Sequence, residues 1–305
     1  MVRWLVLCLA LLMLSCVGWL VYCERANGVD VPAPTEAELR SSLARAAAWV
    51  VANRSTLLRE NNAMLWLFVS EAGRLSNDSR LTSLAREYQA HSTDRTVSRF
   101  FFDSSGIERM REATILLSSD WEDYQRLFVY GATCNVPLSA DPDVVTLLSA
   151  TSGCKNGHFW FRYPWCRTHQ LMGLRFVQRN HCEPDAETAR TIRSVQDIIL
   201  SELRWDFRVC DAYLQRVWTL VESGRRNDVK AIWLRRILDA QRADGGWDGT
   251  DVIVHLPGGR VVCWLSTLSP HIVPMPASNF HTTAQGLYLM ALLLNGPAPA
   301  GGSPN

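Results

Sequence analysis

Hydrophobic and polar positions recur along the chain with a helical period, in two different ways. Between Leu39 and Val51 the apolar side chains return every third or fourth residue, which is typical of an amphipathic helix at a surface. Residues 63–73 are almost wholly apolar, which indicates a helix buried on all sides. Thr35 and Glu38 form a capping-box pattern before the first of these segments. We therefore expect outer amphipathic helices to alternate with inner apolar ones.

The same periodicity predicts that most of the remaining chain is helical. Further helices are expected at residues 75–88, 97–135, 168–181, 185–203, 205–223 and 228–241. Residues 134–164 carry several prolines and glycines and are expected to be irregular. One β-hairpin, 252–255 with 260–264, is predicted around the turn at 257–259. The expected class is all-α.

Residues 232–294 contain the most informative pattern. An amphipathic segment ends at residues 242–249, where three glycines in five positions oppose further helix, and a wholly apolar helix follows at 279–294. The turn, Gln241-Arg-Ala-Asp-Gly245-Gly246-Trp247, resembles the Gln-x3-Gly-x-Trp repeat of the terpene cyclase and protein prenyltransferase superfamily, the α/α toroids. The resemblance implies that residues 37–296 form a ring of helical hairpins around a central cavity. It implies no particular reaction, because many activities share this architecture.

The N-terminal sequence predicts a membrane anchor. Residues 4–22 form an uninterrupted apolar run of 19 residues, which as a helix measures ~28 Å, close to the thickness of a bilayer core. Cleaved signal peptides have shorter cores, so we favour an uncleaved anchor over residues 1–23; the alternative cleavage points are Ser15-Cys16 and Ala26-Asn27-Gly28. Arg3 would keep the N-terminus inside and place the rest of the chain outside the cytoplasm. Residues 24–36 are expected to be a linker and 297–305 a disordered tail.

Composition and cysteine usage refine this interpretation. The 305 residues carry a net charge of +1, which gives no support for nucleic-acid binding. Six cysteines follow the anchor, and an oxidising compartment would allow up to three disulfides; the alternative is that several are buried thiols. These are Cys134, Cys154, Cys166, Cys182, Cys210 and Cys263. A helix over 168–181 would separate Cys166 from Cys182, which leaves Cys134, Cys154 or a more distant residue as its partner.

Candidate chemistry begins with two histidines. His169 and His281 each stand at the start of an expected inner helix, and in a toroid such starts face the mouth of the cavity. His281, Gln285 and Tyr288 share one stripe of the last helix, so Gln285 and Tyr288 are candidate substrate-binding residues. The alternative is that the histidines cap their own helices and are hydrogen-bonded in the core.

Carboxylates supply the other candidates. Asp244, Asp248 and Asp251 surround Trp247, and acids beside an aromatic platform are typical of carbohydrate-active sites; the alternative is a turn with an anchoring tryptophan. Glu71 lies in an apolar helix, where burial would raise its pKa and suit a catalytic acid; the alternative is a pair with Arg74 at the rim.

Metal binding is the weakest of the candidate chemistries. The resemblance to prenyltransferases implies zinc on His281, with Cys263 and Asp251 as the other candidate ligands. The closely spaced Asp-x-Cys pair of that family is missing, as is the DxDD motif of terpene cyclases, so we expect no cofactor and keep zinc as the alternative. No nucleophile elbow, zincin motif, phosphate loop or Rossmann fingerprint is present in the sequence.

Two functions remain open at this point. The first is an enzyme that acts on a glycan or lipid-like substrate in the central cavity. The second is a non-catalytic binding or scaffold protein, whose aromatic segment 154–165 meets a partner. An enzyme requires His169 and His281 to converge on an open, polar-lined pocket, whereas a scaffold would fill the centre with Leu, Met and Trp.

Overall fold

The computed structural model describes residues 2–91, 111, 121–149, 165–206, 210–249, 251–264, 270–275 and 277–296, and for some residues of the first helix and of the strands only the backbone. Within this part the chain is an all-α protein with one small sheet. Of the helix expected over 97–135, the structure describes a helix at Asp123–Thr133. The expected tail, residues 297–305, lies outside the described residues.

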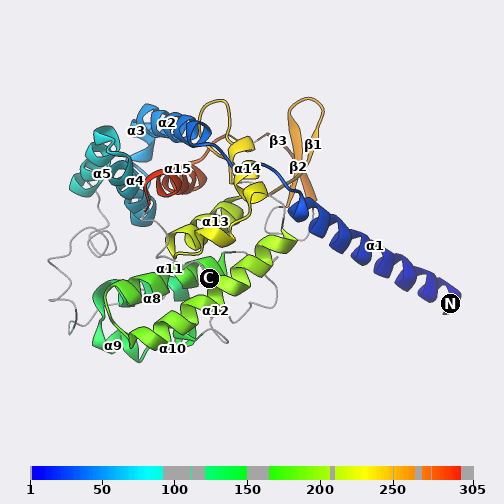
Figure 1. Ribbon diagram of the computed structural model, residues 1–305, viewed down its shortest axis with the longest axis horizontal. Helices are drawn as coiled ribbons and strands as arrows, with labels where there is room; N and C mark the ends of the chain where they lie inside the picture. The colour runs from blue at the N-terminus through cyan, green and yellow to red at the C-terminus, as the bar shows by residue number, and fades with distance from the viewer. Residues whose placement is uncertain are drawn as a thin grey trace, which may run out of the picture.

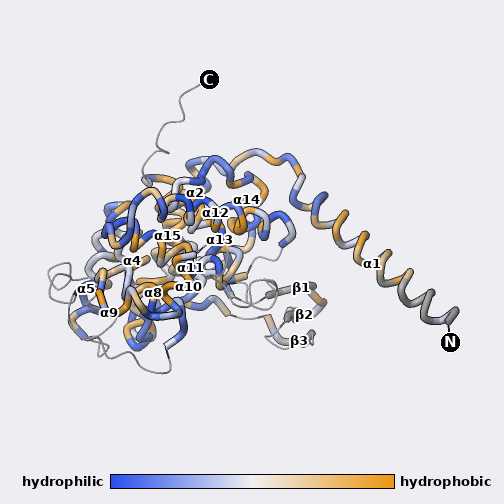
Figure 2. The backbone as a smooth tube through the Cα atoms, turned by 90° about the horizontal axis from the view of Figure 1, so that it is seen from below, coloured by the Kyte–Doolittle hydropathy of each residue, from blue (hydrophilic) through white to orange (hydrophobic). Residues whose placement is uncertain are grey.

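The N-terminal helices follow the expected order. Helix α1 (Val2–Gly28) leads away from the body in both views of the chain (Figures 1 and 2). Then come α2 (Glu36–Ala52), the short α3 (Arg54–Leu57), α4 (Ala63–Ser76) and α5 (Ser79–His91). The predicted capping box of α2 is confirmed, since the Thr35 amide donates to Glu38 Oε2 at 2.7 Å. Among the helices so described, none is both long enough and apolar enough to cross a membrane.

The middle of the chain adds α8 (Asp123–Thr133), α9 (Val136–Ser139), α10 (Pro142–Leu148), α11 (Cys166–Arg179), α12 (Asp185–Trp205) and α13 (Asp211–Glu222). Helices α9 and α10 overturn the expectation of irregular structure for residues 136–148, whereas residues 150–164 of that expected loop, with nearly all of the aromatic segment 154–165, lie outside the described residues. Asn135 and Asp141 accept hydrogen bonds from the first turns of these helices, and Pro137 and Pro142 occupy first-turn positions. A proline there sacrifices no intrahelical hydrogen bond, so these prolines start helices instead of breaking them.

The C-terminal part contains a short 3₁₀ turn (Arg226–Asp228), α14 (Ala231–Asp239), three strands and α15 (Phe280–Asn295). Strands β1 (Asp251–Leu256) and β2 (Arg260–Trp264) pair antiparallel, which confirms the predicted hairpin. Strand β3 (Pro270–Pro274) was not predicted and pairs antiparallel with β2, giving the order β1-β2-β3.

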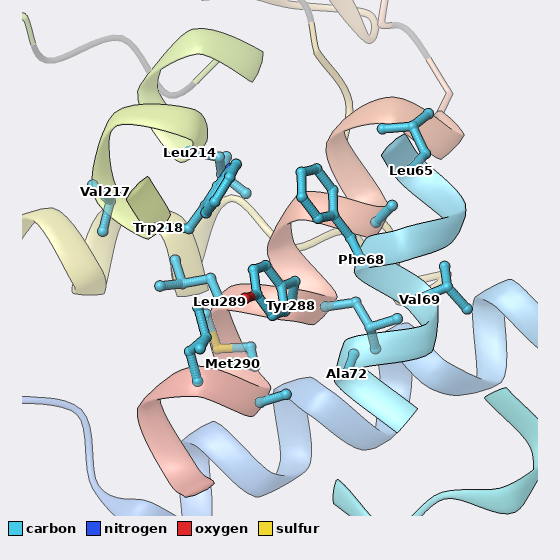
Figure 3. Close-up of a cluster of buried hydrophobic side chains, with 14 of the residues drawn as sticks. Leu65, Phe68, Val69, Ala72, Leu214, Val217, Trp218, Tyr288, Leu289 and Met290 are labelled. Carbon is cyan, nitrogen blue, oxygen red and sulfur yellow. The ribbon is translucent and has the colours of Figure 1, made fainter. Parts of the chain in front are cut away.

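Helix α15 is the centre of the hydrophobic core. It packs against α2, α4 and α13, and its residues from Phe280 to Leu293 are buried except His281. Aromatic side chains join these helices (Figure 3): the Phe68 ring of α4 stacks on Tyr288 with centroids 5.3 Å apart and meets Trp218 of α13 edge-on at 4.8 Å. Helix α11 packs against α13, α8 and α12, so the order of neighbours is α4–α15–α13–α11–α8.

The turn that carries the toroid-like motif joins three helices. Gln241 Nε2 donates to the Ser42 carbonyl of α2 at 2.9 Å and to the Gly245 carbonyl at 2.8 Å. Trp247 is buried and donates from Nε1 to the carbonyl of Ile237 in α14 at 2.8 Å, while its backbone amide donates to Thr283 Oγ1 of α15 at 3.0 Å. The motif therefore holds α2, α14 and α15 together.

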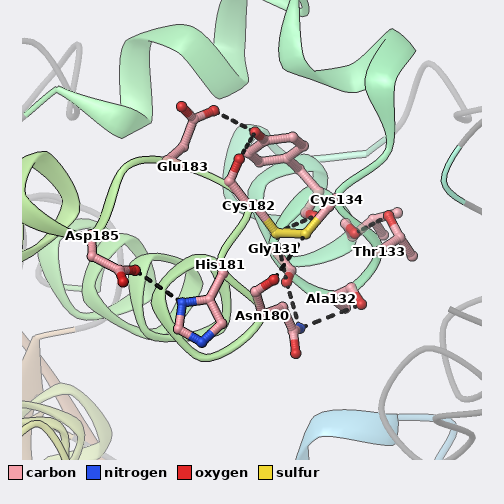
Figure 4. The surroundings of a disulfide bond; sticks show 11 residues. Gly131, Ala132, Thr133, Cys134, Asn180, His181, Cys182, Glu183 and Asp185 are labelled. Atoms are coloured by element: carbon pink, nitrogen blue, oxygen red, sulfur yellow. Dashed lines mark hydrogen bonds and ion pairs between the residues drawn. A yellow bond between two sulfur atoms is a disulfide. The ribbon is translucent and has the colours of Figure 1, made fainter. Parts of the chain in front are cut away.

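The cysteines are only partly paired as disulfides. Cys134, at the end of α8, is bonded to Cys182, just after α11 (Figure 4). Cys166 is also disulfide-bonded, and its partner is neither of these two. Cys210 is a buried thiol, so the six cysteines after α1 do not form three disulfides. The side chains of Cys154 and Cys263 lie outside the described residues.

Candidate functional site

A cavity of about 420 Å³ opens where five helices meet. Its size falls within the range of small-molecule sites, and aromatic and polar side chains share its walls. Helices α4, α8, α11, α13 and α15 all contribute to its lining, with Met64, Phe68, Tyr124, Phe128, His169, Met172, Asp211, Gln215 and His281. Residues that are more than 200 positions apart in sequence thus face one another.

His169 sits in the wall of this cavity, one turn inside α11. Its ring stacks on Tyr124 with centroids 4.1 Å apart and an interplanar angle of 15°. Gln215 of α13 lies 3.2 Å away, from its Nε2 to His169 Nε2, and Gln215 Oε1 accepts a hydrogen bond from Thr168 at 2.6 Å. Because an amide nitrogen only donates, His169 Nε2 accepts and the ring proton belongs on Nδ1.

The surroundings of His169 favour the neutral ring. Burial lowers the pKa of His169 to about 3, and the charge of His281 acts in the same direction. The interaction with the Trp165 backbone works against them. At neutral pH His169 is therefore an uncharged hydrogen-bonding group.

His281 and Asp211 form the second part of the site. His281 is the second residue of α15, its side chain is 48% exposed, and its Nε2 lies 3.6 Å from Asp211 Oδ2. Asp211 is the first residue of α13, and its Oδ1 accepts a hydrogen bond from Gln285 Nε2 at 2.6 Å. Gln285 is itself held by Trp218, whose Nε1 donates to its Oε1 at 3.1 Å. A buried chain of hydrogen bonds thus fixes the carboxylate beside the histidine.

Of the candidate residues taken from sequence, three contribute to this site. His169 and His281 line the cavity, and Gln285 lies behind it, fully buried, where it orients Asp211. Asp211 was missed. It is the first residue of α13, and His169 and His281 also lie in the first turns of their helices, so applying the same positional rule to acidic residues would have identified it.

Glu71 and Tyr288 lie at a different and smaller cavity of about 80 Å³. Glu71 forms an ion pair with Arg74, with 2.8 Å between Oε2 and Nη2, as the alternative interpretation proposed. Tyr288 is stacked on Phe68, and burial raises the pKa of its hydroxyl. Neither side chain lines the cavity that contains the histidines.

The residues around Trp247 form a hydrogen-bonded turn. Asp244 accepts hydrogen bonds from Ser278 Oγ at 2.7 Å and from the Gly246 amide at 3.1 Å. Asp248 pairs with Arg242 at 3.0 Å. The side chains of Asp251 and Cys263 lie outside the described residues, and within the described ones no three His, Cys, Asp or Glu side chains are grouped to hold a metal.

Comparison with known proteins finds no family model, no curated protein and no solved structure that matches this chain.

Proposed function

We propose that this chain is a membrane-anchored α/α-toroid protein that acts as an enzyme on a glycan or lipid-like substrate in its central cavity. The observation that carries the proposal is the meeting of His169, His281 and Asp211 in one cavity. Titratable side chains that share one cavity with aromatic and amide groups support an enzyme.

The toroid interpretation is supported by the order of neighbouring helices. The five helices α4, α15, α13, α11 and α8 succeed one another as neighbours, and all five contribute to the cavity wall. Flanking helices pack behind them: α5 on α4, α2 on α15, α12 on α11 and α10 on α8. Helices that share one cavity, most of them with a second helix packed against them, support the architecture that the Gln241–Trp247 motif implies.

Proton transfer is the chemistry that best suits the His281–Asp211 pair. A carboxylate beside Nε2 favours the tautomer with its proton on that nitrogen, which leaves Nδ1 to accept a proton from water or a substrate hydroxyl. The carboxylate then stabilises the imidazolium that forms. The present separation of 3.6 Å is longer than a hydrogen bond, and such contacts commonly shorten when substrate binds.

The lining favours a substrate with both apolar and hydroxyl-bearing faces. Tyr124, Phe128 and Trp165 offer aromatic surface, and the amides of Asn62 and Gln125 stand beside them. Aromatic rings pack on the C–H faces of sugars or on lipid chains, while amides hydrogen-bond hydroxyls. Neutral His169 adds an uncharged aromatic ring to the same wall, with its Nδ1 atom buried.

A non-catalytic scaffold is the second candidate, and one observation favours it. On the side of the smaller cavity, the space between α4, α13 and α15 is filled by Phe68, Trp218 and Tyr288. Such filling is what a toroid that retains only its shape would have.

The membrane anchor is proposed from the apolar run of residues 4–22. Within α1 the described large apolar side chains from Trp4 to Tyr22 are each at least 43% exposed, which is costly in water and favourable in lipid. The side chains of residues 5–9 and 12, which complete the run, are outside the described set. The Cys134–Cys182 disulfide supports placing the body in an oxidising compartment outside the cytoplasm.

The proposal is tested by turnover of a panel of neutral oligosaccharides and of acyl and prenyl lipids, measured by mass spectrometry. We expect one class to be converted by the wild-type protein, and His281→Ala and Asp211→Asn each to lower kcat/KM by ~100-fold or more, as loss of general-base catalysis does. The matched control is His181→Ala, which removes the exposed His181–Asp185 pair in the turn after α11 and should leave turnover unchanged.

Retention of wild-type turnover by His281→Ala would contradict the assignment of this residue. Stoichiometric binding of a panel member without conversion, abolished by Tyr124→Ala and His169→Ala, would establish the binding protein instead of the enzyme.

A further inference from the structure

The end of α1 is built into the body of the protein. Most described residues of this helix are exposed, but Cys23 is 0% and Asn27 is 1% exposed. These two residues lie in the last two turns, where α1 packs against α12 and α14 (Figure 1).

The Asn27 side chain uses its whole hydrogen-bonding capacity in this contact. Its Nδ2 donates to the carbonyl of Arg204 at 2.7 Å and to that of Cys23 at 3.1 Å. Its Oδ1 accepts from Trp233 Nε1 at 2.9 Å and from Arg236 Nη1 at 2.8 Å. One amide therefore connects the end of α1 to both α12 and α14.

The backbone around Asn27 is held as well. The Asn27 carbonyl accepts a hydrogen bond from Lys230 Nζ at 3.0 Å, and the Ala26 carbonyl accepts one from Arg236 Nη2 at 2.6 Å. Beyond the helix, Arg235 donates to the carbonyls of Pro32 and Ala33 at 2.9 and 3.0 Å. Residues 24–36, which were expected to be a linker, are thus hydrogen-bonded to the body at residues 26, 27, 32 and 33.

We propose that residues 23–33 are a structural part of the folded body, so that the anchor is retained and not removed at Ala26-Asn27-Gly28. The inference rests on the proposed anchor. Cleavage after Ala26 or Asn27 would break the segment that satisfies the Trp233 indole, which is only 2% exposed. A buried donor without a partner destabilises the fold, so a processed chain would be the less stable one.

A consequence is that the body does not swing freely on the anchor. Helix α1 continues without a break from Val2 to Gly28, and its last turn is bonded to two helices of the body. The body, and the cavity with it, is therefore held in one orientation relative to α1.

The test uses the full chain purified from membranes. Intact-mass measurement should show an N-terminus that includes residues 1–28. In the same preparation Asn27→Ala should lower the Tm by ~5 °C or more, because it removes the hydrogen-bond partner of Trp233 Nε1, of Arg236 Nη1 and of the Arg204 carbonyl. Trp233→Phe keeps the ring, removes only the indole donor, and should give a smaller decrease. The matched control is Arg25→Ala, an exposed neighbour in the same turn, with an expected change within ~1 °C.

Two results would overturn the inference. One is a mature chain that begins at Asn27, Gly28 or Val29; the other is an Asn27→Ala protein with the Tm of the wild type. Failure of the proposed anchor gives a different result: a chain with an intact N-terminus that alkaline carbonate releases from membranes, and in which Asn27→Ala still lowers the Tm.

Discussion

His169 and His281 line one cavity, but their surroundings assign them different tasks. His169 is stacked on Tyr124 and hydrogen-bonded to Gln215, and burial holds it neutral. His281 is half exposed to the cavity and stands beside a carboxylate that Gln285 fixes in place. His169 therefore contributes an uncharged ring to the wall, whereas His281, backed by a carboxylate, can accept a proton from a hydroxyl-bearing ligand.

The neutral state of His169 predicts how stability depends on pH. Its pKa is about 3 in the folded protein and ~6.5 in an unfolded chain, so between these values the unfolded state binds the proton and the folded state does not. The free energy of unfolding contributed by this group is therefore constant above pH ~6.5 and falls as the pH decreases toward 3.

Urea unfolding at pH 7, 5.5 and 4.5 checks this expectation. His169→Gln should lose less stability than the wild type over that interval, while His91→Gln, at the exposed end of α5, should follow the wild type. If the free energy of unfolding decreased equally with pH in His169→Gln and in the wild type, this result would contradict a buried, neutral His169.

At the scale of elements, the turn after α14 depends on glycine at one position. Gly245 has φ +96°, and a Cβ there would lie 2.4 Å from the Arg45 carbonyl oxygen of α2. Both the backbone conformation and the close approach exclude a side chain. Gly224, after α13, has φ +91° but open space around its Cα, so it isolates the effect of conformation alone.

This pair of glycines gives a matched prediction. Gly224→Ala should lower the free energy of unfolding by ~1 kcal/mol, from backbone strain. Gly245→Ala should lower it by ~3 kcal/mol or more, because α2 must also move away from the turn. Chemical denaturation measures both decreases in the free energy of unfolding. Equal decreases would show that the close approach of Gly245 to α2 does not contribute to stability.

At the scale of the whole molecule, the disulfide acts through the unfolded chain. Cys134 and Cys182 are 48 residues apart, and in the chain-entropy model closing a loop of that length stabilises the fold by ~4 kcal/mol. It joins the ends of α8 and α11, two helices that both line the cavity.

We expect the free energy of unfolding of the Cys134→Ala, Cys182→Ala double variant to be lower by ~4 kcal/mol, so that it unfolds at a lower denaturant concentration than the wild type. Cys210→Ala, which removes a buried thiol that forms no disulfide, should change stability by only ~1 kcal/mol. A double variant as stable as Cys210→Ala would show that this bridge is dispensable.

The sequence by itself determined the local features of this protein. Capping at Thr35, the apolar character of α4 and α15, the β1–β2 hairpin and the turn from Gln241 to Trp247 all follow from residues within a few positions of one another. Such features depend on backbone propensity, on hydrogen bonds to nearby side chains and on the periodicity of burial, which can be read along the chain. The error at α9 and α10 was also local, since a first-turn proline looks like a breaker until the cap before it is considered.

Only the tertiary structure decided which helix faces meet. The partners of Cys134 and Asn27 lie 48 and about 200 residues away in sequence, and Asp211 gains its role from His281 and Gln285 on another helix. On α15, Gln285 bonds to Asp211 while Tyr288, one turn further, lines the smaller cavity. Periodicity shows that a face is buried but not what covers it, because the packing of distant helices selects each partner.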